Sequence, residues 1–165
     1  MSYPRKILLI VLLSALAAPV TAAIVEYSLD QMVGGSEALV RGRVVSLHCH
    51  WLDGPGSIIV TDVGFAVAES WLGSLRSGQT LEFQVVGGEV GGIGQRREHE
   101  PVFRLGEEAV LFLWTRPDQD RLSIFNAEQG KYRIIGDTVV GLRQEPIALS
   151  EFHRQIEGAL QRQGR

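Results

Sequence analysis

The chain has 165 residues, of which 16 are basic and 19 acidic, and its formal net charge is −3 at neutral pH. This balance argues against a nucleic-acid partner, because nucleic-acid-binding domains present a strongly basic face. Cys49 is the only cysteine, so no internal disulfide can form and hydrophobic burial has to hold the fold together. The length suits a single domain.

The N-terminus has the three parts of a secretory signal peptide. Arg5 and Lys6 precede an apolar run at residues 7–18, which ends in small residues. The run is shorter than the roughly 20 residues that span a bilayer, and no second long apolar stretch follows. We therefore expect cleavage after residues 1–22, a secreted or periplasmic protein without a transmembrane segment, and one domain at residues 23–165. An uncleaved N-terminal anchor is the alternative.

The first elements after the signal are a short helix and two long strands. Ser28 and Gln31 fit a capping box, which predicts a helix at residues 28–33. Apolar residues alternate with polar ones over residues 38–51 and again over residues 58–73. The sequence DGPG between the two runs is typical of a turn, so we expect the strands to pair as a hairpin.

The second half of the chain predicts shorter strands and a final helix. The run AVLFLWT is apolar almost throughout, as expected for a strand buried on both faces. Near the C-terminus the apolar residues recur at helical spacing after Ser150, a candidate N-cap. The predicted strands lie at residues 80–86, 109–115, 122–126, 131–135 and 138–142, and the helix at about 150–162.

Residues 36–115 resemble the netrin-like module of tissue inhibitors of metalloproteases. The resemblance lies in the order of SEALVRGRVVS, VTDVGFAVAESWLGS, TLEFQVVGG and GEEAVLFLW. The segments GGEVGG, GEEAVLFL and QGKYR are also similar to those of uncharacterised bacterial secreted proteins with this fold. The resemblance implies a mainly β protein, a small OB-like barrel of about six strands with a short N-terminal and a C-terminal helix. The inhibitors chelate zinc with an N-terminal cysteine, and Ala23 or Ile24 would stand there in this chain.

The most unusual stretch is VGGEVGGIGQRREHE. Gly87 and Gly92 have the spacing of a phosphate-binding loop, but Ile93 and Gly94 follow where lysine and serine or threonine are needed. A nucleotide cofactor is therefore not expected, and no other cofactor is indicated. We expect the glycines to bend a long connection between two strands, and we assign this structural role to four of them: Gly87, Gly88, Gly91 and Gly92.

The charged part of this connection is the candidate partner-binding site. We expect Glu89, Arg96, Arg97 and His99 to make polar contacts with a partner, with Lys131 close by. Long loops in compact domains are often functional, which favours a non-catalytic binding module for a protein or an envelope component. The competing interpretation is that these charges only keep the loop solvated.

A histidine cluster is the basis of a rival hypothesis. His48 and His50 share one face of a predicted strand, and His99 lies in the glycine-rich connection. Together they could serve a metal-dependent or hydrolytic enzyme. However, no spacing typical of a metal site and no nucleophile motif is present, so we predict no catalytic or metal site.

Overall fold

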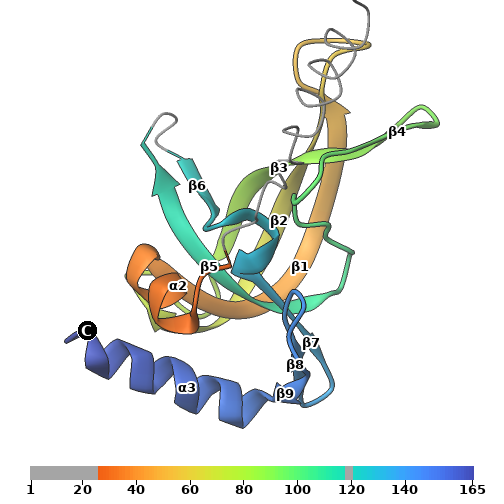
Figure 1. Ribbon diagram of the computed structural model, residues 1–165. Coiled ribbons are helices and arrows are strands. Elements are labelled where there is room, and N and C mark those ends of the chain that lie inside the picture. The colour runs from red at the N-terminus through yellow and green to blue at the C-terminus, as the bar shows by residue number, and fades with distance from the viewer. Residues whose placement is uncertain (1–25, 118–120) are drawn as a thin grey trace, which may run out of the picture.

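The computed structural model describes residues 26–117 and 121–165 (Figure 1). The predicted signal peptide, residues 1–22, lies outside the described residues. The described chain forms one open, antiparallel sheet of nine strands in the order β4-β3-β2-β1-β5-β7-β8-β9, with β6 also paired to β5. The strands are β1 (Ala38–Trp51), β2 (Ile59–Leu72), β3 (Thr80–Val90), β4 (Ile93–Arg96), β5 (Glu108–Arg116), β6 (Arg121–Ile124), β7 (Lys131–Ile135), β8 (Thr138–Val140) and β9 (Ile147–Ala148).

The mainly β prediction with a short N-terminal helix and a C-terminal helix is confirmed. The predicted strand number of about six is too low, and the sheet is open and not a closed barrel. Two strands, β4 and β9, were not predicted, because segments of four and two residues are too short to show an alternating pattern. The sheet stays open because β6 lies beside β3 without pairing with it. Its two outer strands are β4 and β9.

The β1–β2 hairpin is the longest feature of the sheet, as predicted. Only the first part of β1 also pairs with β5, so the far end of the hairpin extends away from the helices (Figure 1). The strand register shifts between Arg41 and Gly42. A side chain at this position would run into the carbonyl oxygen of Ala66 and the ring of Phe65, so the close approach of β1 and β2 requires glycine.

Strand β5 separates two hydrophobic cores. Ala109, Leu111 and Leu113 face the core inside the curved sheet, together with Phe65 and Phe83. The alternate residues of β5 face a second core, which β7, β8 and the two helices complete. The prediction that this apolar run is a strand buried on both sides is therefore confirmed.

The helices cover the second core. Helix α2 (Leu29–Gly35) begins with the predicted capping box between Ser28 and Gln31. Helix α3 (Leu149–Arg162) follows the predicted range closely, but its N-cap is Ala148 and not Ser150. The amide of Leu149 instead donates to the carbonyl oxygen of Asp137, at 2.8 Å, which satisfies one free group at the start of the helix.

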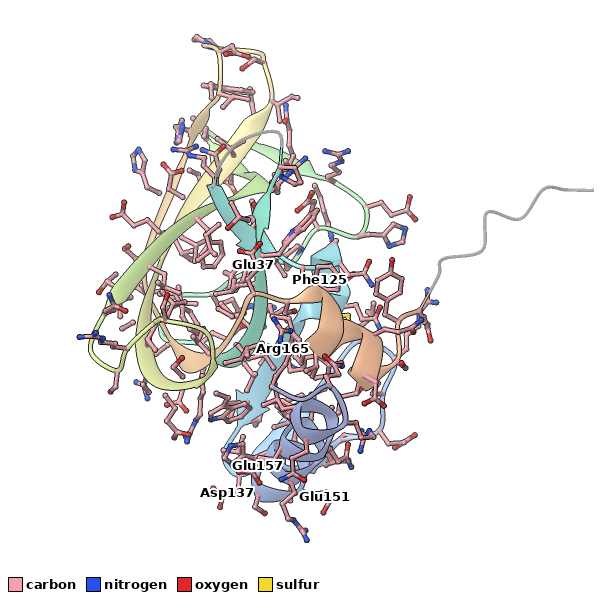
Figure 2. The ribbon with its side chains drawn as sticks, turned by 90° about the vertical axis from the view of Figure 1, so that its left-hand side faces the viewer. Glu37, Phe125, Asp137, Glu151, Glu157 and Arg165 are labelled. Atoms are coloured by element: carbon pink, nitrogen blue, oxygen red, sulfur yellow. The ribbon has the colours of Figure 1, made fainter. Side chains whose placement is uncertain are left out.

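The C-terminal residue ties the two helices together. The guanidinium of Arg165 donates to the carbonyl oxygens of Val33 and Ser36, both at 3.1 Å, at the end of α2 (Figure 2). The Val33 carbonyl oxygen also accepts from the amide of Ser36, the C-cap of α2, at 3.3 Å, so Arg165 adds to the capping of this helix end. Within the described ranges, no helix is both long enough and apolar enough to cross a membrane.

Candidate functional site: a basic groove

The glycine-rich stretch is mainly a β-hairpin and not one long connection. Strand β3 pairs with β2 as far as Val86 and then pairs with β4 from Gly87 to Val90. Gly91 and Gly92 form the turn, with φ values of 59° and 79°. Positive φ at both central residues is the geometry of a tight two-residue hairpin, for which glycine is well suited. Only residues 97–107, between β4 and β5, are irregular.

Gly88 packs where no side chain fits. It has a φ of 135°, and a Cβ atom there would lie 2.6 Å from Thr61 Oγ1 and 2.8 Å from Cys49 Sγ. The Thr61 hydroxyl itself donates to the carbonyl oxygen of Gly87 at 2.6 Å. The hairpin backbone is thereby held against β1 and β2 at this point.

Gln95 fixes β4 to the start of β2. Its side-chain oxygen accepts from the amide of Ile59 at 2.8 Å, and its side-chain nitrogen donates to the carbonyl oxygen of Ser57 at 3.0 Å. Both bonds join segments far apart in sequence. Because Gln95 is held in place, its neighbour Arg96, the last residue of β4, is also fixed in position.

Arg96 and Lys131, two of the predicted site residues, line the same hollow. This hollow has a volume of about 300 Å³ and lies between the β4–β5 connection, β7 and the segment after β8. Five basic residues line it, and we call this hollow the basic groove. They are Arg96, Arg104, Lys131, Arg133 and Arg143.

Lys131 forms the floor of the basic groove. Its ammonium contacts the carboxylate of Glu107, donates to the carbonyl oxygen of Val102 and lies 4.4 Å from the centre of the Phe103 ring. The side chains of Lys131 and Glu107 are only 11% and 8% exposed. Burial is the main cause that lowers the pKa of Lys131, and the positive charges of Arg133 and Arg104 lower it further.

The arginines around the groove are poorly neutralised. Arg143 makes an exposed ion pair of 3.4 Å with Glu26. Within residues 26–117 and 121–165, Arg96, Arg104 and Arg133 have no ion pair with a carboxylate. The groove contains two acidic residues: Glu107, which neutralises Lys131, and Glu128. An excess of positive charge therefore gathers in one concave place on an acidic chain.

The other predicted contact residues lie elsewhere. Arg97 does not line the basic groove; it lines a hollow of about 780 Å³ that also contains His48 and a smaller hollow of about 130 Å³ that Arg96 shares. Glu89 is exposed on β3, opposite Gly94. His99 has a left-handed backbone with a φ of 65°. The carbonyl oxygen of His99 accepts a hydrogen bond from the amide of Glu128 at 2.9 Å, and the His99 side chain is exposed.

The histidines divide into a pair and a separate residue. The rings of His48 and His50 stack with their centres 5.5 Å apart, and His50 Nδ1 lies 3.4 Å from the carboxylate of Asp62. His99 makes its ion contact with Glu98 instead. Across the described part of the chain, no three side chains of histidine, cysteine, aspartate or glutamate have an arrangement that could hold a metal ion.

Three arginines of the groove were not predicted as site residues from the sequence. Arg133 could have been recognised, because it lies two residues after Lys131 and therefore on the same face of a strand. Arg104 and Arg143 lie in irregular segments, where no periodicity indicates which way a residue faces. Their position depends on the packing of the β4–β5 connection against β7 and β8.

No protein-family model, no curated protein and no solved structure matches the chain. The chemistry of the groove is therefore the guide to function. Guanidinium groups bind carboxylates and phosphates through two parallel hydrogen bonds. Among the residues that the structure describes, those that line the groove include no serine, cysteine or histidine that could act as a nucleophile or proton shuttle. The arrangement is suited to holding an anion.

Proposed function

We propose that the protein is a non-catalytic binding module, secreted or periplasmic, that binds an anionic group of a partner protein or envelope component in the basic groove. The observation that carries this proposal is the convergence of four arginines and one lysine on a hollow of about 300 Å³. These residues come from β4, β7 and two connecting segments, so the fold gathers them from distant parts of the sequence.

Electrostatic cost supports a binding role for the groove. Like charges repel, and the positive charges of Arg104 and Arg133 both lower the pKa of Lys131. An anion would relieve this repulsion and fill the hydrogen-bonding positions of the unpaired arginines. Because the whole chain is acidic, the attraction is local to the groove and would not favour nucleic acid in general.

The N-terminal sequence and the strand order are the basis for the remaining parts of the proposal. The signal-like residues 1–22 favour a location outside the cytoplasm. The sequence resemblance is the basis for proposing a netrin-like module, here with β1, β2 and β3 as a meander in an open sheet. Modules of this kind commonly bind partners through the segments that connect their strands.

Defined anions can test the proposal directly. Inorganic phosphate and citrate would be titrated into the purified protein and followed by protein NMR. The double substitution Arg104→Gln and Arg133→Gln should weaken binding by about tenfold or more, because a hydrogen bond to a charged group is worth roughly 1.5–3 kcal/mol. Lys131 stays unchanged, since its loss would leave Glu107 buried without a partner.

A matched control removes the same charge elsewhere. Arg76 and Arg154 are exposed and lie outside the basic groove. The double substitution Arg76→Gln and Arg154→Gln should therefore leave the affinity within about twofold, a change explained by long-range charge alone. Equal losses in the two double variants, or no binding of either anion to the wild type, would contradict the proposal.

A further inference from the structure

An apolar hollow adjoins the basic groove. It has a volume of about 130 Å³ and lies under the connection between β4 and β5. Three residues, Arg96, Pro101 and Val102, line both the hollow and the groove. We call this second hollow the apolar pocket. Its remaining apolar walls include Leu47, Val85 and Phe103.

Phe103 is the boundary between the two hollows. Its side chain lines the apolar pocket and is almost completely buried, packed edge-on against Phe83 with the ring centres 5.4 Å apart. The ammonium of Lys131, the floor of the groove, lies 4.4 Å from the centre of the same ring. Positive charge and apolar surface therefore meet at one aromatic side chain.

Two polar side chains in the wall of the apolar pocket, Thr61 and Gln95, already have hydrogen-bond partners. The Thr61 hydroxyl donates to the carbonyl oxygen of Gly87 at 2.6 Å and lies 3.2 Å from the sulfur of Cys49. Gln95 uses both ends of its amide to hold β2. The wall around these two residues therefore leaves few free hydrogen-bonding groups for water and favours apolar atoms, whereas the charged residues Arg96, Arg97 and Glu100 line another part of the pocket.

We infer that the basic groove and the apolar pocket form one composite site for a single-chain anionic amphiphile. The carboxylate or phosphate head lies among the arginines of the groove, and the first carbons of the chain lie in the apolar pocket. Arg96 borders both hollows and contacts the head where the chain begins. This inference rests on the proposed function, because the groove supplies the charge that the head requires.

The small volume of the apolar pocket limits how far the affinity can rise with the length of the ligand's hydrocarbon chain. Each methylene group that enters the pocket should raise the affinity by up to about fourfold, the ratio that corresponds to full burial of one such group. The gain should stop after a few carbons, when the pocket is full. An uncharged amphiphile of the same length lacks the head group and should bind at least about tenfold more weakly.

Calorimetric titration of the full chain with a series of carboxylates tests the inference without any substitution. Acetate, butanoate, hexanoate and octanoate would be compared with inorganic phosphate and with octanol, all below their aggregation limits. We expect affinity to rise from acetate to hexanoate or octanoate and to fall for octanol. Octyl phosphate should bind as tightly as octanoate. This result would mean that the groove accepts any compact anionic head group and not only a carboxylate.

Protein NMR adds the location of the ligand. The methyl groups of Leu47 and Val85, in the apolar pocket, should shift with octanoate but not with acetate. The methyl groups of Val139 and Ile156, in the second core, should stay unchanged. Leu47→Trp places a bulkier side chain at the pocket wall. It should reduce the rise in affinity with the length of the carboxylate chain and leave acetate binding intact.

The outcomes separate this inference from the proposed function. If acetate and phosphate bind as tightly as octanoate, the apolar pocket takes no part and the composite site is wrong, while the anion-binding groove stands. If an acidic peptide binds more tightly than octanoate at the same groove, the assigned ligand class is wrong. If no anion binds, and Arg104→Gln with Arg133→Gln changes nothing, both proposals are wrong.

Discussion

Two groups of ion pairs lie beside β5, and they differ sharply in burial. Lys131 and Glu107 form a pair at the floor of the basic groove, with side chains 11% and 8% exposed. On the other side of β5, Arg41 and Arg43 contact Glu69 and Glu108. The side chains of this second cluster are between 29% and 59% exposed.

Because they differ in burial, the two groups of ion pairs affect the stability of the fold differently. Charges in the exposed cluster keep most of their hydration, so their attraction is screened and contributes little to stability. Charges in the buried pair have lost hydration, and each depends on the other to compensate for that loss. Retaining a buried lysine next to two further positive charges adds to this cost, which is expected where the fold serves binding.

The largest predicted effect follows from breaking the buried pair. Glu107→Gln should lower the free energy of unfolding by about 3–5 kcal/mol, because it leaves the Lys131 ammonium buried without a counter-charge. Urea denaturation followed by circular dichroism measures this change. A loss below about 1 kcal/mol would mean that water already reaches Lys131.

Replacing both partners is the control for that experiment. The double substitution Lys131→Met and Glu107→Leu removes the buried charges together and keeps a similar apolar volume. Its stability should be within about 1 kcal/mol of the wild type, or higher, since well-packed apolar residues often replace buried ion pairs without loss. A double variant as unstable as Glu107→Gln would show that packing, and not the orphaned charge, caused the damage.

The second prediction concerns repulsion inside the groove. Arg104→Gln with Arg133→Gln should raise the free energy of unfolding by about 0.5–1 kcal/mol, although it weakens anion binding. It should also raise the pKa of Lys131, because both arginines lower that pKa in the wild type. The pKa should stay below its ordinary value, since burial is the largest cause and is unchanged. Thermal denaturation and NMR titration of the lysine provide the two measurements, and a less stable variant would contradict the trade-off between stability and binding.

The third prediction concerns the exposed cluster. Arg43→Gln removes its contact with Glu108, and the Arg43 side chain is 59% exposed. We expect a loss of at most about 0.5 kcal/mol in urea denaturation, because solvent screens the pair. Raising the salt concentration should shrink the difference between variant and wild type. A loss close to that of Glu107→Gln would remove the contrast between the clusters.

The sequence predicted the body of the fold well because its strands are long or strongly apolar. The run at Ala109–Leu113 indicated the central strand, and the observed burial of alternate residues in two cores confirms it. The facing of residues in the first strand was harder to predict, because the pairing of β1 with β2 shifts between Val44 and Ser46 and leaves Val45 47% exposed. A bulge of this kind reverses which residues face the core, and no sequence period reports it.

The candidate site was predicted only in part. Arg96 and Lys131 were named from sequence, but their meeting depends on long-range contacts such as those of Gln95 with β2. Glu89 and His99 were grouped with them because the sequence predicted that both share one loop with Arg96, whereas Glu89 lies in a tight hairpin with its turn at Gly91 and Gly92, and neither residue lines the groove. Loop sequences reveal charge but not direction, which tertiary packing sets.

The smallest predicted effect is the acid response of the exposed cluster. The indole of Trp71 donates to Glu69 at 3.0 Å, and this bond and the charge of Arg41 lower the pKa of Glu69. A carboxylate with a lowered pKa stabilises the fold above its unfolded pKa and loses that contribution as pH falls through its folded pKa. Between pH 5 and pH 3 the free energy of unfolding of the wild type should therefore fall by about a few tenths of a kcal/mol more than that of Glu69→Gln. The difference is small because the Glu69 side chain is 45% exposed and solvent screens its charge. Trp71→Phe removes the largest cause and should flatten the pH response almost as much; an unchanged response in both variants would assign the acid sensitivity to other carboxylates.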